Sequence, residues 1–257
     1  MNMKFAANLS LLYPGQPLFE RLAAARQDGF EAVEIQFPYA QPAAELAAEL
    51  RRLDLKLVLI NTPLGSNGEW GLAGLPGQEK RFRADFERAL AVAEQTHCPA
   101  IHVMAGFPPP EAVRSDCIDA LVSNLDWACN AAGPGRMLML EALNHHDMPG
   151  YLYALPGQAA QVIEQVDRPN LRLQFDFFHA GREELPLLST VQSLQPLIHH
   201  VQIAGVPGRH EPDLQYPQLL ESLQWLVAQG YTGWLGFEYI PKGDTSEGLA
   251  WSAPLRP

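Results

Sequence analysis

The sequence predicts an α/β fold, a single (β/α)₈ TIM barrel over residues 1–257, from three observations. Short β-rich apolar runs alternate with longer helical patterns from end to end, which is typical of βα units built on a parallel sheet. Eight such units recur at a spacing of about 30 residues, which favours a closed barrel over an open sheet. No change in composition marks a linker, and a chain of 257 residues suits one barrel.

Each strand is predicted where a short apolar run rich in β-forming residues is bounded by polar or turn residues. The eight candidates are residues 4–9, 32–37, 56–61, 100–105, 136–141, 171–176, 199–204 and 234–239. Helical periodicity fills the intervals, for example over residues 17–27, 78–95, 111–131, 158–166 and 217–229. Within residues 78–95 the apolar side chains recur on one helical face, opposite Arg, Asp and Glu.

Two connections between these elements stand out. Residues 62–77 form a long Gly-rich segment after the third strand, and loops of that length are often lids, although a packed surface insertion fits equally well. Residues 106–111, with three consecutive prolines, are predicted to be a rigid loop that leads into the fourth helix, with Glu111 near the helix start.

Composition narrows the class of protein. The net charge is -11 and the pI is near 5.1, which argues against a nucleic-acid partner, since phosphate binding needs clustered Lys and Arg. No apolar run approaches the roughly 20 residues of a membrane span, and the first residues lack a signal-peptide pattern. Cys98, Cys117 and Cys129 show no metal or redox spacing. We therefore expect a cytoplasmic protein with reduced thiols and no membrane partner.

The predicted strands carry polar residues on one face only. Alternation places Glu238 on the face opposite Leu235 and Phe237, and Asp176 on the face opposite Leu173 and Phe175. The apolar face must pack on the helices, so the mixed face points into the barrel. The same alternation directs the following residues inward: Asn8, Glu34 or Gln36, Asn61, His102, Glu141, Gln174, His200 and Gln202. Polar groups at the carboxyl ends of barrel strands predict an active site there.

Four of these residues close successive strands, from the fifth to the eighth: Glu141, Asp176, Gln202 and Glu238. Neighbouring strands lie about 4.8 Å apart, so these side chains can converge. Three crowded carboxylates cannot all stay ionised without a cation, and an oxygen ligand set with a neutral Gln favours Mg²⁺ or Mn²⁺ over Zn²⁺. The alternative is a buried ion-pair layer with Arg172 and neighbouring His residues.

The chain resembles a known family at this point. Its segments FAANLS, GFEAVEIQFPY, GEWGLAGLPG, HVMAG, EALNHHDMPGY, LQFDFFH, HVQIAGVPGRHEP and GFEY…GDTSEGL are similar to those of the hydroxypyruvate isomerases and 2-oxo-tetronate isomerases, within the sugar isomerase and epimerase group of TIM barrels. The resemblance runs nearly end to end. It departs in two places, because the segment DLQYP after Pro212 is shorter than usual and Ile240 replaces a common Lys or Arg.

The resemblance implies roles for individual residues. Glu141 and Glu238 correspond to the catalytic acid/base pair, and Glu141, Asp176, Gln202 and Glu238 to the metal ligands. His179 and Arg209 match residues that hold substrate oxygens in the wider group.

The residues themselves are consistent with that chemistry. Moving a proton between adjacent carbons through an enediolate needs a base, a group that returns the proton and positive charge at the oxygens. Arg209 or His210 is the candidate partner for a substrate carboxylate, although a loop salt bridge from Arg209 to Glu211 or Asp213 is the alternative. His102 is equally well explained as a substrate contact and as a hydrogen-bonded core residue.

We therefore expect an intramolecular oxidoreductase that converts hydroxypyruvate to 2-hydroxy-3-oxopropanoate with a divalent metal. A 2-oxo-tetronate isomerase or another ketose epimerase is the alternative within the same chemistry. A zinc-dependent apurinic-site endonuclease would need a His-rich cluster and a basic groove, and a non-catalytic sugar-acid binding protein would not need the acid pair. The expected partner is a small sugar acid, and homo-oligomer formation is left open.

Overall fold

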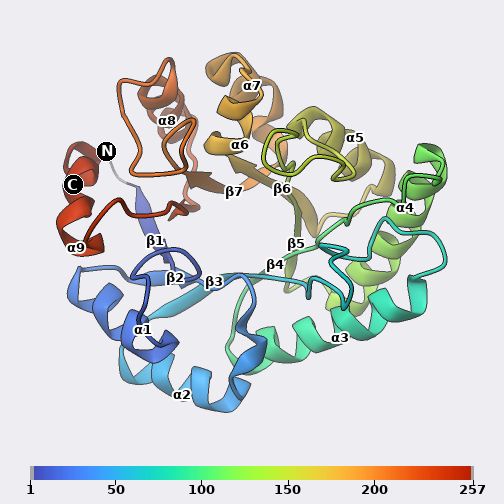
Figure 1. Ribbon diagram of the computed structural model, residues 1–257, viewed down its shortest axis with the longest axis horizontal. Coiled ribbons are helices and arrows are strands. Elements are labelled where there is room, and N and C mark those ends of the chain that lie inside the picture. Colours follow the sequence, from blue (N-terminus) through green and yellow to red (C-terminus); the bar gives the residue numbers. More distant parts are fainter. Residues whose placement is uncertain (1–2, 256–257) are drawn as a thin grey trace.

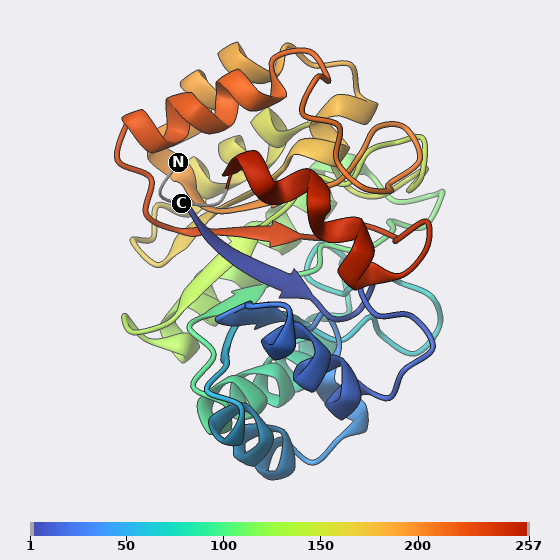
Figure 2. The same cartoon turned by 90° about the vertical axis from the view of Figure 1, so that its left-hand side faces the viewer.

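Eight parallel strands close into a barrel in chain order, β1 to β8 (Figure 1). This computed structural model describes residues 3–255. The strands are β1 (Lys4–Asn8), β2 (Ala32–Glu34), β3 (Lys56–Asn61), β4 (Ala100–His102), β5 (Met137–Leu140), β6 (Leu171–Asp176), β7 (Ile198–Ile203) and β8 (Trp234–Phe237). The first and last strands pair directly, Ala6 with Gly236, and lie side by side in Figure 2. The predicted (β/α)₈ barrel is confirmed.

Helices surround the barrel on all sides (Figures 1 and 2). They are α1 (Leu18–Gln27), α2 (Ala43–Arg52), α3 (Glu79–Gln95), α4 (Arg114–Ala132), α5 (Pro156–Val166), α6 (Phe177–Arg182), α7 (Leu187–Leu194), α8 (Leu219–Ala228) and α9 (Thr245–Gly248). Short 3₁₀ segments cover Pro38–Ala40, Gln195–Leu197 and Leu249–Leu255. Within residues 3–255, every helix is too short or too polar to cross a bilayer.

One helix boundary differs from the prediction. Helix α4 begins at Arg114, so Glu111 lies in the preceding turn and not at the helix start. The Ala112 N–H donates to the Pro109 carbonyl in that turn, and Val113 is still extended. Three prolines hold this stretch away from helical geometry, because each disfavours the α conformation in the residue before it.

Several strands end earlier than predicted, at the carboxyl side. Strand β4 ends at His102: the Val103 N–H still donates to the Met139 carbonyl of β5, but the Met104 N–H donates to the Thr62 hydroxyl at 2.9 Å. Glu141 and Glu238 consequently lie one residue beyond β5 and β8. Their backbone belongs to the loops that build the barrel mouth, while their side chains remain buried.

The two faces of the sheet divide as the alternation predicts. Leu173, Phe175, Leu235 and Phe237 are essentially inaccessible and belong to the core between strands and helices. Inside the barrel, small apolar clusters fill the amino-terminal half: Ala6, Ala32 and Val58 in one, and Leu59, Ala100 and Met139 in the other. Polar residues occupy the carboxyl-terminal half above them.

The long loop 62–77 is tied to its neighbours. Gly71 forms an antiparallel bridge with Ala105, and the Glu69 carboxylate pairs with Arg81 at 2.8 Å. A side chain at Gly71 would overlap the Met104 backbone, and its φ of 109° also requires glycine. Trp70 is held next to it with 38% of its surface exposed. The loop therefore packs against the barrel mouth and presents an indole there.

Removing the Phe237 ring should test the outer core. The ring is fully buried and its centroid lies 5.2 Å from Phe5, 5.5 Å from Phe30 and 4.7 Å from Trp251. We expect Phe237→Ala to lower the free energy of unfolding by about 3–5 kcal/mol, because it removes buried area and leaves a cavity. Urea unfolding measures the loss, with Val113→Ala, at an exposed position, as the control. A loss under about 1 kcal/mol would contradict this packing.

Candidate active site at the carboxyl end of the barrel

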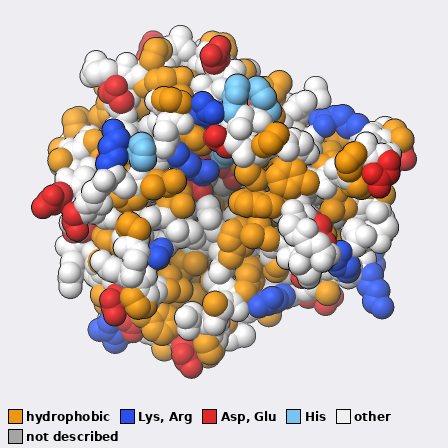
Figure 3. All heavy atoms as spheres, viewed as in Figure 1, with side chains coloured by type: hydrophobic (Ala, Val, Ile, Leu, Met, Phe, Trp, Pro, Cys, Tyr) orange, Lys and Arg blue, Asp and Glu red, His pale blue; other side chains and the backbone are white. Residues whose placement is uncertain are grey.

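A cavity of about 160 Å³ opens at the carboxyl ends of the strands. Figure 3 shows a hollow on this face with charged and His side chains beside hydrophobic ones. Its polar wall contains Gln36, Asn61, His102, Glu141, His179, Arg209 and Glu238. The apolar wall is built from Leu11, Phe37, Trp70, Met104, Leu143 and Met148. The cavity therefore offers polar groups to one side of a small molecule and an apolar surface to the other.

Three carboxylates are buried at this mouth: Glu141, Asp176 and Glu238 are 5%, 4% and 3% exposed. Each has one oxygen without a hydrogen-bond partner, namely Oε1 of Glu141, Oδ2 of Asp176 and Oε2 of Glu238. Burial, together with the neighbouring negative charges, raises the pKa of Glu141 well above its usual value. Burial likewise raises the pKa of Asp176 to about 6 and that of Glu238 to about 8. Buried anions of this kind call for a cation or a proton.

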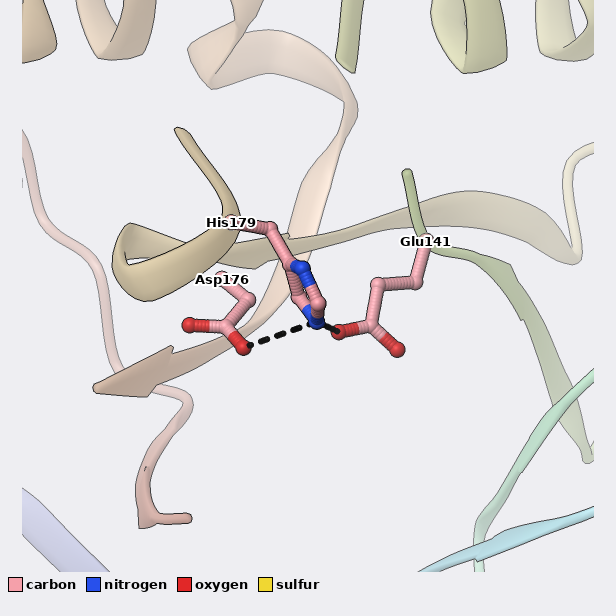
Figure 4. A group of neighbouring side chains, drawn as sticks. All are labelled: Glu141, Asp176 and His179. Carbon is pink, nitrogen blue, oxygen red and sulfur yellow. Dashed lines mark ion pairs between the residues drawn. The ribbon is translucent and has the colours of Figure 1, made fainter. Parts of the chain in front are cut away.

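His179 lies between two of these carboxylates (Figure 4). Its Nε2 atom is 3.9 Å from Glu141 Oε1 and 3.7 Å from Asp176 Oδ2. Burial lowers the pKa of His179 well below its usual value, so the ring is neutral. The Asn144 backbone N–H donates to Nδ1 at 3.0 Å, which leaves the ring proton on Nε2. His179 therefore presents an N–H donor to the site, as expected of a substrate contact.

Arg209 supplies the positive charge of the cavity wall. Its Nη2 atom is 2.9 Å from Glu238 Oε1 and 3.8 Å from Asp176 Oδ2, and its guanidinium stacks on the Phe178 ring at 4.9 Å. Burial alone would lower its pKa, but Glu238 and Asp176 raise it. The alternative salt bridge with Glu211 or Asp213 does not form. Arg209 also has a φ of 55°, a left-handed conformation that costs a non-glycine residue energy.

Gln202 lies in a polar layer just beneath the carboxylates. The Gln174 amide bridges the two levels, donating to Glu141 Oε2 at 2.8 Å and to Gln202 Oε1 at 2.6 Å. Gln202 in turn donates to Glu34, which is also buried. Alternation puts Glu34 and Gln36 on the same face but left open which of them comes near the end of the strand. Strand β2 ends at Glu34, and both side chains point inward, with Gln36 donating to Glu238 Oε1 at 2.5 Å.

Two predicted substrate contacts occupy different settings. His102 lines the cavity with its Nδ1 atom 3.3 Å from Glu141 Oε2, yet neither ring nitrogen has a hydrogen-bond partner, and burial lowers its pKa to about 3. The His210 ring instead lies against the Ile240 carbonyl, at 2.9 Å from Nδ1, and is not among the residues that line the cavity. Sequence could not separate Arg209 from His210, because only the loop conformation decides which one turns inward.

The donor set suits a divalent cation. Glu141 and Asp176 offer carboxylate oxygens within 4.8 Å of each other and of the His179 ring, and three buried carboxylate oxygens have no hydrogen-bond partner. Of the ion-pair alternative, the part that involves Arg172 does not apply, because Arg172 donates to the carbonyls of Arg168 and Leu171. His102 and His179 do lie beside Glu141, at 3.3 Å and 3.9 Å from its carboxylate oxygens. The cluster can hold a metal ion, and its carboxylate oxygens favour a hard one.

The pKa shifts predict how stability depends on pH in the protein treated with a chelator. The folded pKa of Glu238, about 8, and that of Asp176, about 6, lie above the unfolded values near 4. At these two carboxyls the folded state binds more protons than the unfolded state, which lowers stability as the pH rises. Below about pH 7 the buried His102 and His179 oppose this effect, because their folded pKa values lie below the unfolded value and the unfolded state binds the extra protons. Between about pH 7 and 8.5 these rings are neutral in both states and Glu238 dominates, so stability should fall as the pH rises. Urea unfolding from pH 7 to 8.5 checks this, and Glu238→Gln should make the fall smaller. A rise in stability over this window would contradict it.

Comparison with known proteins agrees with this geometry. Residues 22–255 match the family described as xylose isomerase-like TIM barrel. The chain is 41% identical to a 2-oxo-tetronate isomerase of Pectobacterium atrosepticum, covering 98% of this chain and 97% of that one. It is 40% identical to a putative hydroxypyruvate isomerase of Homo sapiens, covering 97% and 94%. A crystal structure from Brucella melitensis described as AP endonuclease, family 2, has 37% identity, a TM-score of 0.92 and coverage of 99% and 100%. The resemblance drawn from the motifs is confirmed, and the chain belongs to the xylose isomerase-like TIM barrel family.

Proposed function

We propose that this protein is an isomerase of small 2-oxo acids that carry a hydroxyl on the next carbon. The observation that carries the proposal is the pair of buried glutamates, Glu141 and Glu238, each with a partnerless oxygen at one small cavity. Relatives at about 40% identity are named 2-oxo-tetronate isomerase and hydroxypyruvate isomerase, which supports the substrate class. Both substrates share the carboxylate, the 2-oxo group and the adjacent hydroxyl, and they differ beyond those reacting carbons.

The residues suit a proton transfer between adjacent carbons. A carboxyl whose pKa lies near neutrality can both take and return a proton, and the pKa of Glu238 is raised to about 8. Glu141, which lines the same cavity, carries out the second proton transfer. The Nε2–H of His179 is available to a substrate oxygen, and the Arg209 guanidinium to the substrate carboxylate.

Glu141, Asp176, Gln202 and Glu238 would hold a divalent cation, with Mg²⁺ and Mn²⁺ as the candidates. When bound, such an ion supplies positive charge to the enediolate oxygens. The partnerless carboxylate oxygens support this assignment.

The description of the Brucella melitensis structure raises nucleic acid as a second substrate class. We favour the small acid for two reasons. The net charge of -11 opposes association with a phosphate backbone, and the cavity combines buried carboxylates with two imidazoles, His102 and His179, which is not the His-rich set that a multi-zinc site needs. A cytoplasmic location remains part of the proposal.

Replacing Glu238 should separate binding from chemistry. Glu238→Gln keeps the shape and one ligand oxygen but cannot act as a base, so turnover of hydroxypyruvate and 2-oxo-tetronate should fall about 10²–10⁴-fold while Mn²⁺ still binds. Solvent exchange of the substrate C–H proton measures the step directly. Glu221→Gln, on the exposed surface of α8, is the matched control. Wild-type exchange in Glu238→Gln, or a wild-type protein inactive on both acids, would refute the proposal.

Replacing Arg209 should reveal the class of substrate. Arg209→Met removes the charge expected to hold the substrate carboxylate, so kcat/KM for 2-oxo acids should fall by the equivalent of about 2–5 kcal/mol. Any turnover of neutral ketoses should be much less affected. Arg182→Met, which breaks only a rim contact with Asp147 at 3.4 Å, is the control. Equal losses on acidic and neutral substrates would show that Arg209 acts on structure alone.

A further inference from the structure

A buried carboxylate, Glu34, lies beneath the proposed catalytic layer and takes no part in the chemistry above. It is 1% exposed, and three side chains converge on it. Asn8 Nδ2 is 3.0 Å from Oε2, Gln202 Nε2 is 2.8 Å from the same oxygen, and His200 Nε2 is 2.5 Å from Oε1. Oε2 of Glu34 accepts both amide hydrogen bonds, so Asn8 and Gln202 must each present an N–H to it.

That requirement fixes the direction of the Gln202 amide. An amide has one donor end and one acceptor end, and the two are nearly equal in size. Because Glu34 accepts from Gln202, the nitrogen of Gln202 faces Glu34 and its oxygen faces the opposite way. Gln202 Oε1 accepts from Gln174, which also donates to Glu141 Oε2. The oxygen of Gln202 therefore lies on the side of Gln174, whose amide nitrogen connects it to Glu141 of the carboxylate cluster.

The backbone is shaped to keep Glu34 in this position. Glu34 is aligned with Asn8 of β1, and both side chains point into the barrel, while the pairing of β2 with β3 shifts register between Val33 and Glu34. On β8, which flanks β1 on the side opposite to β2, a side chain at Gly236 would overlap the Glu34 carboxylate. Gly236 does not have a positive φ, so the reason for glycine is space and not backbone conformation. The absent side chain on β8 makes room for the carboxylate on β2.

We propose that Glu34 is a positioning residue that orients the Gln202 amide, so that Oε1 and not Nε2 faces the metal site. The inference rests on the proposed function, because it takes Gln202 as a ligand. An amide turned the other way would present its N–H group to the cation, and an N–H group cannot act as a metal ligand. Glu34 thus controls metal affinity without touching the cation.

The test compares Mn²⁺ affinity, measured by calorimetry on the chelator-treated full chain, among variants of this layer. Glu34→Gln can accept or donate at the Gln202 contact, so Gln202 is free to turn, and Mn²⁺ should bind about 10–100-fold more weakly. In the double variant Glu34→Gln/Gln202→Glu the ligand is a carboxylate, which offers oxygen in either direction. Affinity should then return to within a few-fold of wild type, with the total charge unchanged.

His200→Gln is the matched control. It breaks the same buried pair as Glu34→Gln but leaves the carboxylate that directs Gln202, so Mn²⁺ affinity should stay near wild type. A role limited to stabilising the fold predicts instead that His200→Gln and Glu34→Gln lose affinity in parallel with melting temperature. If Glu34→Gln does not fold, Gly236→Ala displaces the carboxylate without removing any polar group and should weaken Mn²⁺ binding.

The outcomes separate this inference from the function on which it rests. Wild-type protein that binds no Mn²⁺ would overturn the proposed metal site and the inference together. Normal binding by wild type and by Glu34→Gln would overturn only the role of Glu34. Weak binding by Glu34→Gln that the second substitution fails to restore would also overturn it, because the loss would then not come from the direction of the amide.

Discussion

The burial of three carboxylates at one end of a closed barrel is the constraint on which the rest of this site depends. Glu141, Asp176 and Glu238 have lost most of their contact with water, and each keeps an oxygen without a partner. Desolvation penalises their charged forms, and their proximity adds mutual repulsion. A folded protein keeps such an arrangement only when the surroundings hold it in place, since buried charge is costly to leave uncompensated.

The surrounding groups offset this cost in part. Arg209 pairs with Glu238 and Asp176, Gln36 donates to Glu238, and the Phe178 backbone N–H donates to Asp176 Oδ1 at 2.7 Å. One guanidinium nevertheless faces three acids. The negative charge that Arg209 leaves uncompensated makes the cluster suitable for a cation, and desolvation together with this charge raises the pKa values of Asp176 and Glu238 toward neutral pH. Stability and reactivity of this site thus have the same electrostatic origin.

The barrel supplies the rigidity that this arrangement needs. Small apolar residues such as Ala6, Ala32 and Ala100 fill its amino-terminal half, so the polar layers rest on a packed floor. Above that floor, Gln174 and Gln202 connect the acids to Glu34 through direct hydrogen bonds. The loops contribute side chains such as Trp70 and Met148, which form the apolar wall of the cavity. The strands and the residues that directly follow them hold the acids, and the loops shape the space in front of them.

The sequence by itself determined the barrel and the inward set of polar residues, because strand alternation and βα spacing are local patterns that can be read without knowing the tertiary contacts. It could not decide whether Glu34 or Gln36 closes the second strand, since the predicted apolar run continues to residue 37 whereas β2 ends at Glu34. It also could not assign Arg209 its partners or place His210 outside the cavity. Those outcomes depend on loop conformations and on contacts between residues far apart in the chain, which form only when the barrel closes.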